Sequence, residues 1–322
     1  MIERLGAGFL LVIVLSSFKP LARCLAWTLC FERPQSLRVR DALRAYLIGD
    51  AVGNVLPVGI LVSEPAKAVL VRDRVPLVES FSALAVENLF YSLSVALFIF
   101  SGTAALLLNF PLAKPLRYAS MGVLFGIAML ILLAGYFLRK QPKFLSGALE
   151  SLYRRGLARR YLETRRERVR SVEERIYGFY RRNRARFLPI LLVEASFHLA
   201  GVLEVYVILL LITGTAPAVL TAFVLEAVNR VVNVAFKFIT LRVGVDEVGT
   251  GMVTRILNFG TASGVALAIL RKARILVWTA IGFALLAHRG LTLRAVTEEA
   301  QQAAADKAND APDVAGLPTR RL

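Results

Sequence analysis

The sequence predicts an all-α fold, a polytopic membrane helical bundle with two re-entrant hairpins in an inverted repeat. Hydrophobic residues make up 57% of the 322 residues, and the mean hydropathy is +0.60. The apolar residues come in blocks of roughly 20, the helix length that crosses a hydrocarbon core about 30 Å thick. Two other blocks carry charges, glycine and, in the first, proline. Backbone broken in this way is tolerated at membrane depth only where protein or a water-filled cavity surrounds it.

The charge of the chain is strongly positive, with 40 Lys and Arg against 23 Asp and Glu, a net charge of +17. On a soluble protein this balance would suggest nucleic acid. Here the charge lies between apolar blocks, so we interpret it as membrane topology and attraction to anionic lipid, and expect no nucleic-acid partner. Cys24 and Cys30 both lie in the first apolar block, which argues against a disulfide framework. That block continues past Lys19 and Pro20, so no cleavable signal peptide is evident.

The first half of the chain contains three predicted spans and one broken segment. We predict transmembrane helices over Leu5–Phe31, with a kink at Pro20, and over Leu77–Leu108 and Leu116–Leu138. Leu43–Val71 differs, because a lipid-facing helix would not tolerate its polar residues. We interpret it as a re-entrant hairpin or a discontinuous helix pair, on the basis of Asp50, Asn54, Pro57, Gly59, Glu64, Pro65 and Lys67.

A hydrophilic segment separates the two halves. Arg139–Arg186 contains 16 basic and 5 acidic residues, with apolar residues at helical spacing, which predicts amphipathic helices along the membrane face. An excess of Lys and Arg marks cytoplasmic segments. If each charged hairpin enters and leaves on one face, Arg72–Arg74 and Arg271–Arg274 are also cytoplasmic and Met1 is outside.

The second half is expected to repeat this pattern. We predict spans over Leu188–Ile212 and Ala218–Phe238, and a second charged, glycine-rich hairpin at Thr240–Gly251. Met252–Leu270 and Ile275–His288 are predicted as the last two spans.

The domain organisation follows from these elements. One integral membrane domain covers 1–290, with halves of about 1–138 and 187–290 around the basic segment 139–186. Residues 291–322 are polar and rich in Ala, Glu, Gln and Asp, so we expect a tail that buries no core, with a short helix followed by disorder.

Two segments suggest an internal repeat. Gly49–Asn54 with Leu56–Pro65 and Leu225–Arg230 with Leu241–Gly249 each place a carboxylate before Ala-Val, then a Val-Gly turn, then a second carboxylate. The spacing between the carboxylates differs, so chance similarity stays an alternative. The predicted topology puts the first hairpin on the cytoplasmic face and the second on the outer face, the inverted repeat found in many secondary transporters.

The motifs of this chain resemble a known family. Leu56–Lys67 is similar to the signature of proline, glycine, glutamate and a basic residue in the lysylphosphatidylglycerol synthase transmembrane region, or flippase-like, family. The resemblance covers about residues 5–288 and is closest to the branch associated with hopanoid biosynthesis. The segments that resemble the second half of the family are Phe197–Tyr206, Leu225–Val228, Val243–Gly249 and Leu270–Arg274.

What the resemblance implies is a lipid translocase fold with two re-entrant elements and no catalysis of its own. It also implies one more helix ahead of Leu5–Phe31. Thr240 stands where the family pattern has proline, which leaves the sharpness of the second bend open. The aminoacyl-transferase domain of some relatives is missing from this sequence, so lysyl transfer is not implied.

A translocase needs a polar path through the hydrocarbon, where unpaired charge is expensive. Basic side chains can hold a phosphate and carboxylates an amine or hydroxyls, while glycine lets backbone approach a head group. The alternative is ion pairing that only stabilises the hairpins, and Glu226 with Arg230 can pair at (i, i+4) spacing. The candidate lipid-binding residues are Asp50, Asn54, Pro57, Gly59, Glu64, Lys67, Glu87, Glu226, Arg230, Arg242, Gly244, Asp246 and Glu247.

Other functional patterns are weak. Glu194 and His198 share a helix face, but two ligands are too few for a convincing metal site, and we expect a buried polar contact. No catalytic triad, phosphate-binding loop or nucleotide fingerprint appears, so we expect no cofactor.

The sequence thus predicts a multi-pass protein of the bacterial inner membrane that moves a lipid between leaflets. Its partners would be an anionic phospholipid, a glycolipid or a hopanoid, together with proteins of lipid biosynthesis. The alternatives are an enzyme, or the membrane subunit of one, that modifies a lipid head group, and a scaffold that presents lipid without transporting it.

Overall fold

The computed structural model describes residues 2–32, 34–56, 59–140, 178–179, 182–236 and 244–309. Throughout these residues the chain is helical, with no strand. The helices are α1 (Ile2–Ser16), α2 (Phe18–Leu29), α3 (Val39–Val55), α4 (Ile60–Val69), α5 (Leu77–Asn109), α6 (Lys114–Lys140), α9 (Arg184–Thr213), α10 (Val219–Ala235), α11 (Val245–Ile256), α12 (Thr261–His288) and α13 (Leu293–Asn309).

Within the described ranges, four segments are long and apolar enough to cross a membrane: Gly6–Leu29, Leu77–Asn109, Lys114–Leu133 and Arg184–Thr213. They correspond to α1 with α2, α5, α6 and α9, which confirms four of the predicted spans and makes this a multi-pass membrane protein. The break in the first span is at Ser17 and not at Pro20. Pro20 instead lies in the first turn of α2, where its missing N–H has no intrahelical acceptor to lose.

The prediction of two last spans, Met252–Leu270 and Ile275–His288, is wrong. The chain forms the short α11, turns at 257–260 and continues as one 28-residue helix, α12. Arg271–Arg274, which we expected on the cytoplasmic face, lie at the middle of this helix. These basic residues interrupt the apolar sequence pattern but do not end the helix, because Arg271 and Arg274 pair with buried carboxylates of other helices.

The first charged segment forms a pair of short helices. In it, α3 and α4 are joined through Leu56–Gly59 and pack against each other. A Cβ atom on Gly59 would overlap the backbone carbonyl of Gly53, so only glycine permits this approach. Pro65 was expected to break the chain, but α4 continues through it. The packing of α4 against α3, α5 and α13 offsets the hydrogen bond that proline cannot donate.

The second charged segment does not form a pair by itself: its described part belongs to α11, which packs against α10. The prediction of α10 as the span Ala218–Phe238 is not confirmed, because α10 has only 17 residues and is not among the described helices long and apolar enough to span. The second pair therefore consists of α10 and α11. The segment 237–243 that joins them lies outside the described residues. Helices of 17 residues, such as α3 and α10, are about 25 Å long, and helices of 10 or 12 residues, α4 and α11, are about 15–18 Å long. None of the four is long enough to cross the hydrocarbon core alone.

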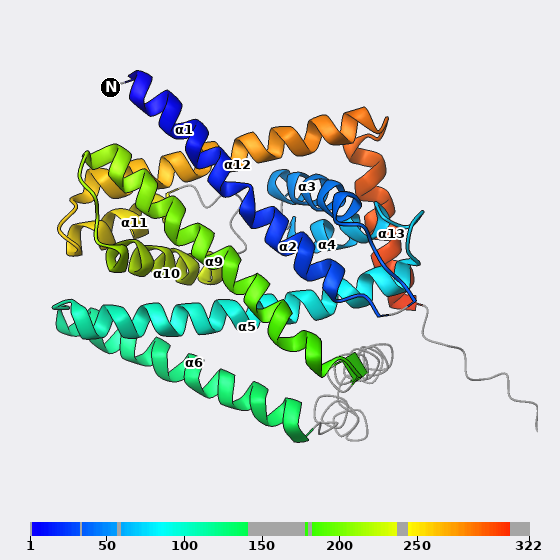
Figure 1. Cartoon of the computed structure of the whole chain (residues 1–322), viewed down its shortest axis with the longest axis horizontal. Coiled ribbons are helices and arrows are strands. Elements are labelled where there is room, and N and C mark those ends of the chain that lie inside the picture. The colour runs from blue at the N-terminus through cyan, green and yellow to red at the C-terminus, as the bar shows by residue number, and fades with distance from the viewer. Residues whose placement is uncertain are drawn as a thin grey trace, which may run out of the picture.

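The two pairs occupy opposite ends of the long helices (Figure 1). Near its start α5 contacts α4, and Gly102 farther along α5 packs on Ala227 of α10. The order is reversed on α12, whose Gly264 packs on α11 and whose Gly282 packs on α3. Between α5 and α12, the α1–α2 segment and α9 cross the bundle diagonally.

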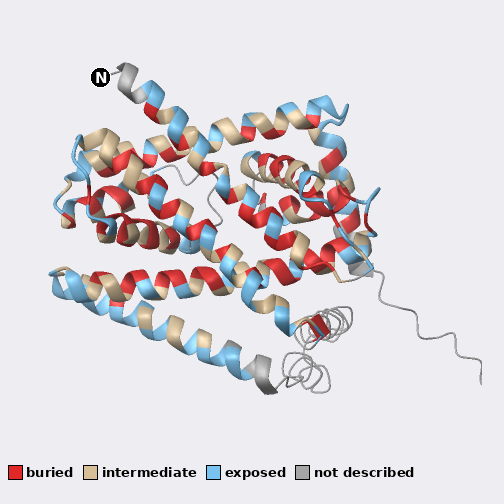
Figure 2. Ribbon diagram, in the orientation of Figure 1, coloured by how far each residue is buried: buried red, intermediate tan, exposed pale blue. Residues whose placement is uncertain are grey.

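The apolar core is divided along the same axis. One large cluster surrounds the first pair and includes Trp27, Phe90 and Ile190. Another surrounds the second pair and includes Val205 and Leu267. By contrast, α6 packs mainly on α5 and is exposed over most of its length (Figure 2), as a helix facing lipid would be.

The predicted polar tail contributes more than expected. In α13 the side chains of Val296, Ala300 and Ala303 are buried, and the helix packs against α4. The expectation that this segment buries no core is therefore wrong, because these three residues recur at (i, i+3) and (i, i+4) spacing and form one apolar face. Residues 310–322 lie outside the described residues.

Candidate functional site

Charged side chains gather at the middle of the bundle, between the two large apolar clusters. They belong to α2, α5, α9 and α12 and to the short helices α4 and α10 that pack against these. All but Arg274 are buried, and Glu194 is completely inaccessible. We call this set the charged layer: Lys19, Arg23, Lys67, Glu87, Glu194, Glu204, Glu226, Arg230, Arg271 and Arg274.

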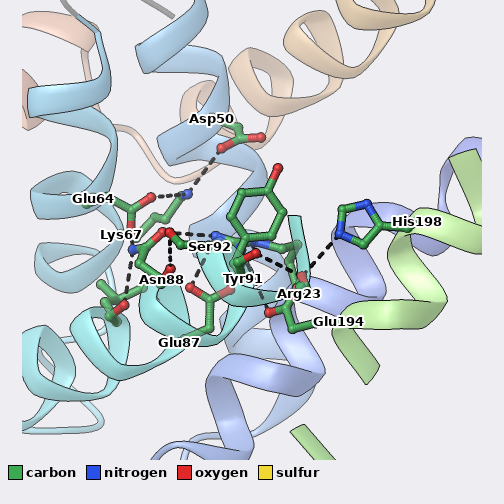
Figure 3. Close-up of polar contacts among 12 residues, drawn as sticks. Arg23, Asp50, Glu64, Lys67, Glu87, Asn88, Tyr91, Ser92, Glu194 and His198 are labelled. Carbon is green, nitrogen blue, oxygen red and sulfur yellow. Dashed lines mark hydrogen bonds and ion pairs between the residues drawn. The ribbon is translucent and has the colours of Figure 1, made fainter. Parts of the chain in front are cut away.

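One side of the layer is centred on Arg23 (Figure 3). Its Nε lies 2.9 Å from Glu87 Oε1, and its Nη2 donates to Glu87 Oε2 at 3.1 Å and to Asn88 Oδ1 at 3.2 Å. Glu194 Oε1 lies 3.7 Å from Nη1. The guanidinium also stacks 3.8 Å from the ring centroid of Tyr91. A single cation therefore faces two buried carboxylates.

The first hairpin joins this side of the layer through Lys67. The Lys67 ammonium lies 2.9 Å from Glu64 and 3.1 Å from Asp50. Asn88 Nδ2 donates to Glu64 Oε2 at 3.0 Å, which links the hairpin to Arg23. The exposed fraction of the side chains falls inward, from 46% at Asp50 and 29% at Glu64 to 2% at Lys67. These contacts form a polar path from α3–α4 to the centre.

The other side of the layer has an excess of basic groups. Lys19 Nζ lies 2.6 Å from Glu204 Oε2, and Arg274 Nε lies 2.9 Å from Glu204 Oε1. Glu226 is likewise shared, with Arg230 Nη2 donating to Oε1 at 2.6 Å and Arg271 Nη2 to Oε2 at 2.5 Å.

His198 lies between the two sides. Its ring stacks on those of Phe98 and Tyr91, and its Nε2 lies 3.1 Å from Ser94 Oγ. This confirms the expected buried polar contact. Nowhere in the described parts of the chain do three or more His, Cys, Asp or Glu side chains lie where they could hold a metal ion.

The second hairpin brings one further ion pair. Glu247 accepts a hydrogen bond from the N–H of Gly244 at 2.8 Å and caps the start of α11. The same carboxylate pairs with Lys272 of α12. Gly244 has a φ of 86°, a conformation that glycine adopts without strain.

A layer of this kind is costly for a structure that needs only to be stable. Removing charges from water costs several kcal/mol per ion even when they are paired, and well-packed apolar residues often serve as well or better. Charges kept in the middle of membrane helices therefore mark a functional path by default.

The comparison with known families agrees with this arrangement. A family model described as the lysylphosphatidylglycerol synthase TM region matches residues 1–289. The chain belongs to this family. No curated protein and no solved structure matches it. The match covers both hairpins and all ten residues of the charged layer.

The family's match thus includes all of the predicted site, and the structure brings several of those residues together. Asp50, Glu64, Lys67 and Glu87 lie in or beside the layer, and Glu226 and Arg230 form the predicted (i, i+4) pair.

The remaining predicted residues lie elsewhere or outside the described part. Asn54 donates to Thr279 of α12 at 2.9 Å, and Gly59 forms the turn of the first hairpin. Asp246 is buried in α11. Pro57 and Arg242 lie outside the described residues.

Six members of the layer escaped the sequence-based selection: Lys19, Arg23, Glu194, Glu204, Arg271 and Arg274. A signal for the first four was present, because a charged residue inside an apolar span is functional by default. Arg271 and Arg274 gave a misleading signal, since a basic cluster between two apolar blocks is typical of a loop.

Proposed function

We propose that this protein moves a polar-headed lipid between the two leaflets of a bacterial inner membrane. The charged layer receives the head group at mid-depth, and the two hairpins open it alternately to one face and the other. The head group would belong to an anionic phospholipid, a glycolipid or a hopanoid-type lipid. The proposal assigns no catalytic step to the chain.

One observation carries this proposal: charged side chains lie in the interior of the long helices α9 and α12, and not at their ends. Glu194 and Glu204 lie on either side of the centre of α9, and Arg271 and Arg274 are at the centre of α12. A head group crossing about 30 Å of hydrocarbon meets its largest barrier at that depth.

The placement of the hairpins supports an alternating mechanism. Each is too short to span, and they sit at opposite ends of α5 and α12. We infer that α3–α4 enters from the cytoplasmic face and α10–α11 from the outer face, as in transporters built from inverted repeats. The basic residues around the first hairpin, Arg38, Arg40, Arg72 and Arg74, favour this orientation.

The test is leaflet exchange in reconstituted vesicles. Fluorescent phosphatidylglycerol, glucosyldiacylglycerol and a hopanoid are each placed in vesicles with and without protein, and an impermeant quencher reports the outer fraction over time. We expect the wild-type protein to accelerate exchange of at least one of the three.

A matched pair of variants links exchange to the site. Glu64→Gln keeps the size of the side chain and the acceptor for Asn88 but removes the charge opposite Lys67, so we expect exchange to slow by about tenfold or more. Glu298→Gln removes an exposed carboxylate of α13, whose partner within the described part of the chain is Arg294 on the same helix, and should leave exchange unchanged. Wild-type protein that accelerates none of the three lipids contradicts the proposal, and a lipid altered chemically would favour a head-group enzyme.

A further inference from the structure

Four cations share two carboxylates on the basic side of the charged layer. Lys19 and Arg274 pair with Glu204, while Arg230 and Arg271 pair with Glu226. The four cations come from three elements, α2, α10 and α12, and all are buried or nearly so. Among the described pairings this side therefore carries two more positive than negative charges.

The Arg23 side has the opposite imbalance. There, Arg23 and Lys67 face four carboxylates, namely Asp50, Glu64, Glu87 and Glu194. A bound anion would be repelled by that surplus and attracted by the basic one. The imbalance thus distinguishes two parts of one layer, and it fixes where a negative group would be held.

Two of the guanidinium groups also have an N–H donor that makes no hydrogen bond within the described residues. Arg230 Nε and Arg271 Nη1 are buried and have no hydrogen-bond partner within the described residues. The residues are 8% and 7% exposed, so water reaches them poorly. Buried donors normally find an acceptor, because an unmet one costs about 1–3 kcal/mol. Both guanidiniums are held by the same carboxylate, Glu226, which places them beside each other.

We propose that Arg230 and Arg271, with Lys19 and Arg274 beside them, form the subsite for the phosphate group of the transported lipid. This inference rests on the proposed function and deepens it by naming the chemical class of the head group. A phosphodiester supplies the missing negative charge and several acceptor oxygens. Guanidinium groups bind such oxygens in a fixed forked geometry.

The structure also explains why the subsite can survive without a ligand. Glu226 pairs with both guanidiniums, and Glu204 pairs with both Lys19 and Arg274. Removing one cation therefore leaves each carboxylate paired. In contrast to an ordinary buried ion pair, loss of Arg271 should not expose an unpaired charge.

The test uses the full chain in dodecyl maltoside micelles, with binding followed by the rise in unfolding temperature as ligand is added. Three probes separate the possible ligands: phosphatidylglycerol, glucosyldiacylglycerol with the same tails and no phosphate, and glycerol 3-phosphate with no tails. The variants are Arg271→Gln and, as a matched control, Arg255→Gln, which removes an exposed arginine from the neighbouring α11.

We expect phosphatidylglycerol to bind the wild-type protein most tightly, and Arg271→Gln to weaken its binding by about tenfold or more. Arg255→Gln should change it by less than about twofold, as expected for an exposed charge. Without ligand, Arg271→Gln should unfold at the wild-type temperature or higher, because surplus positive charge is reduced. If Arg271→Gln does not fold, Arg274→Gln provides the same comparison, since Lys19 still pairs with Glu204.

Two results would overturn the phosphate subsite: equal binding of glucosyldiacylglycerol, or unchanged binding by Arg271→Gln. Equal binding of glycerol 3-phosphate would overturn the assignment of the subsite to a lipid, because the phosphate would then bind without lipid tails. Leaflet exchange is measured separately on the same preparations. A wild-type protein that binds phosphatidylglycerol through Arg271 but exchanges no lipid refutes transport and keeps the subsite. If the protein exchanges lipids equally with and without a phosphate, and Arg271→Gln does not change the rate, the subsite is refuted and transport is kept.

Discussion

At the scale of single residues, the charged layer depends on where its carboxylates are held. Glu226 is 1% exposed and fixes two guanidiniums from different helices. Its position depends in turn on Gly201 of α9, which has no side chain. A Cβ atom on Gly201 of α9 would lie 2.5 Å from Glu226 Oε1, closer than two non-bonded atoms can approach. Glycine is therefore required at 201 for close packing between α9 and α10.

Gly201→Ala should displace the Glu226 carboxylate from Arg230 and destabilise the protein. Overpacking a filled interior costs about 1–3 kcal/mol, which thermal unfolding in detergent would detect. Gly126→Ala on α6 is the control, because a Cβ atom there meets nothing within 4 Å. Alanine forms helices better than glycine by about 1 kcal/mol, so that variant should be as stable as wild type or more stable. Equal effects of the two substitutions would contradict the role given to Gly201.

At the scale of elements, apolar length predicted four of the seven expected spans correctly, and charge predicted the breaks poorly. The long apolar blocks correspond to α5, α6 and α9, because about 20 mostly apolar residues have few alternatives to a span. The first hairpin was also predictable, since Pro57 and Gly59 stop a helix locally. α12 was not predictable in this way. Its basic residues form ion pairs with Glu204 and Glu226, which are distant in sequence. A local sequence pattern does not show such partners.

The continuity of α12 gives a prediction for hydrogen exchange. Backbone amides from Ala268 to Leu276 should exchange as slowly as those near Leu267, because they donate within a buried helix. Mass spectrometry of the detergent-solubilised protein would measure this. Amides of 257–260, in the turn before the helix, provide a fast-exchanging reference in the same sample. Rapid exchange over Arg271–Arg274 would mean that a loop divides α12 into the two spans first expected.

At the scale of the whole molecule, the account makes one central claim. We propose that the helix pairs α3–α4 and α10–α11 enter the membrane from opposite faces and meet the charged layer at its middle. The two apolar clusters, one around each pair, leave the layer between them. Sequence reasoning predicted two re-entrant hairpins in an inverted repeat, and that arrangement stays a prediction. It also placed two spans after each hairpin, whereas α11 is followed by the single α12.

The most direct test is labelling of single cysteines by a membrane-impermeant maleimide, in vesicles of known orientation. The background has Cys24 and Cys30, both buried, replaced by alanine. Arg40→Cys and Arg74→Cys flank the first hairpin, and Thr215→Cys and Arg255→Cys flank the second; all four positions are exposed. We predict that the first two are labelled only from the cytoplasmic face and the last two only from the outer face. Labelling of all four from one face, or of the two ends of either hairpin from different faces, would contradict the account.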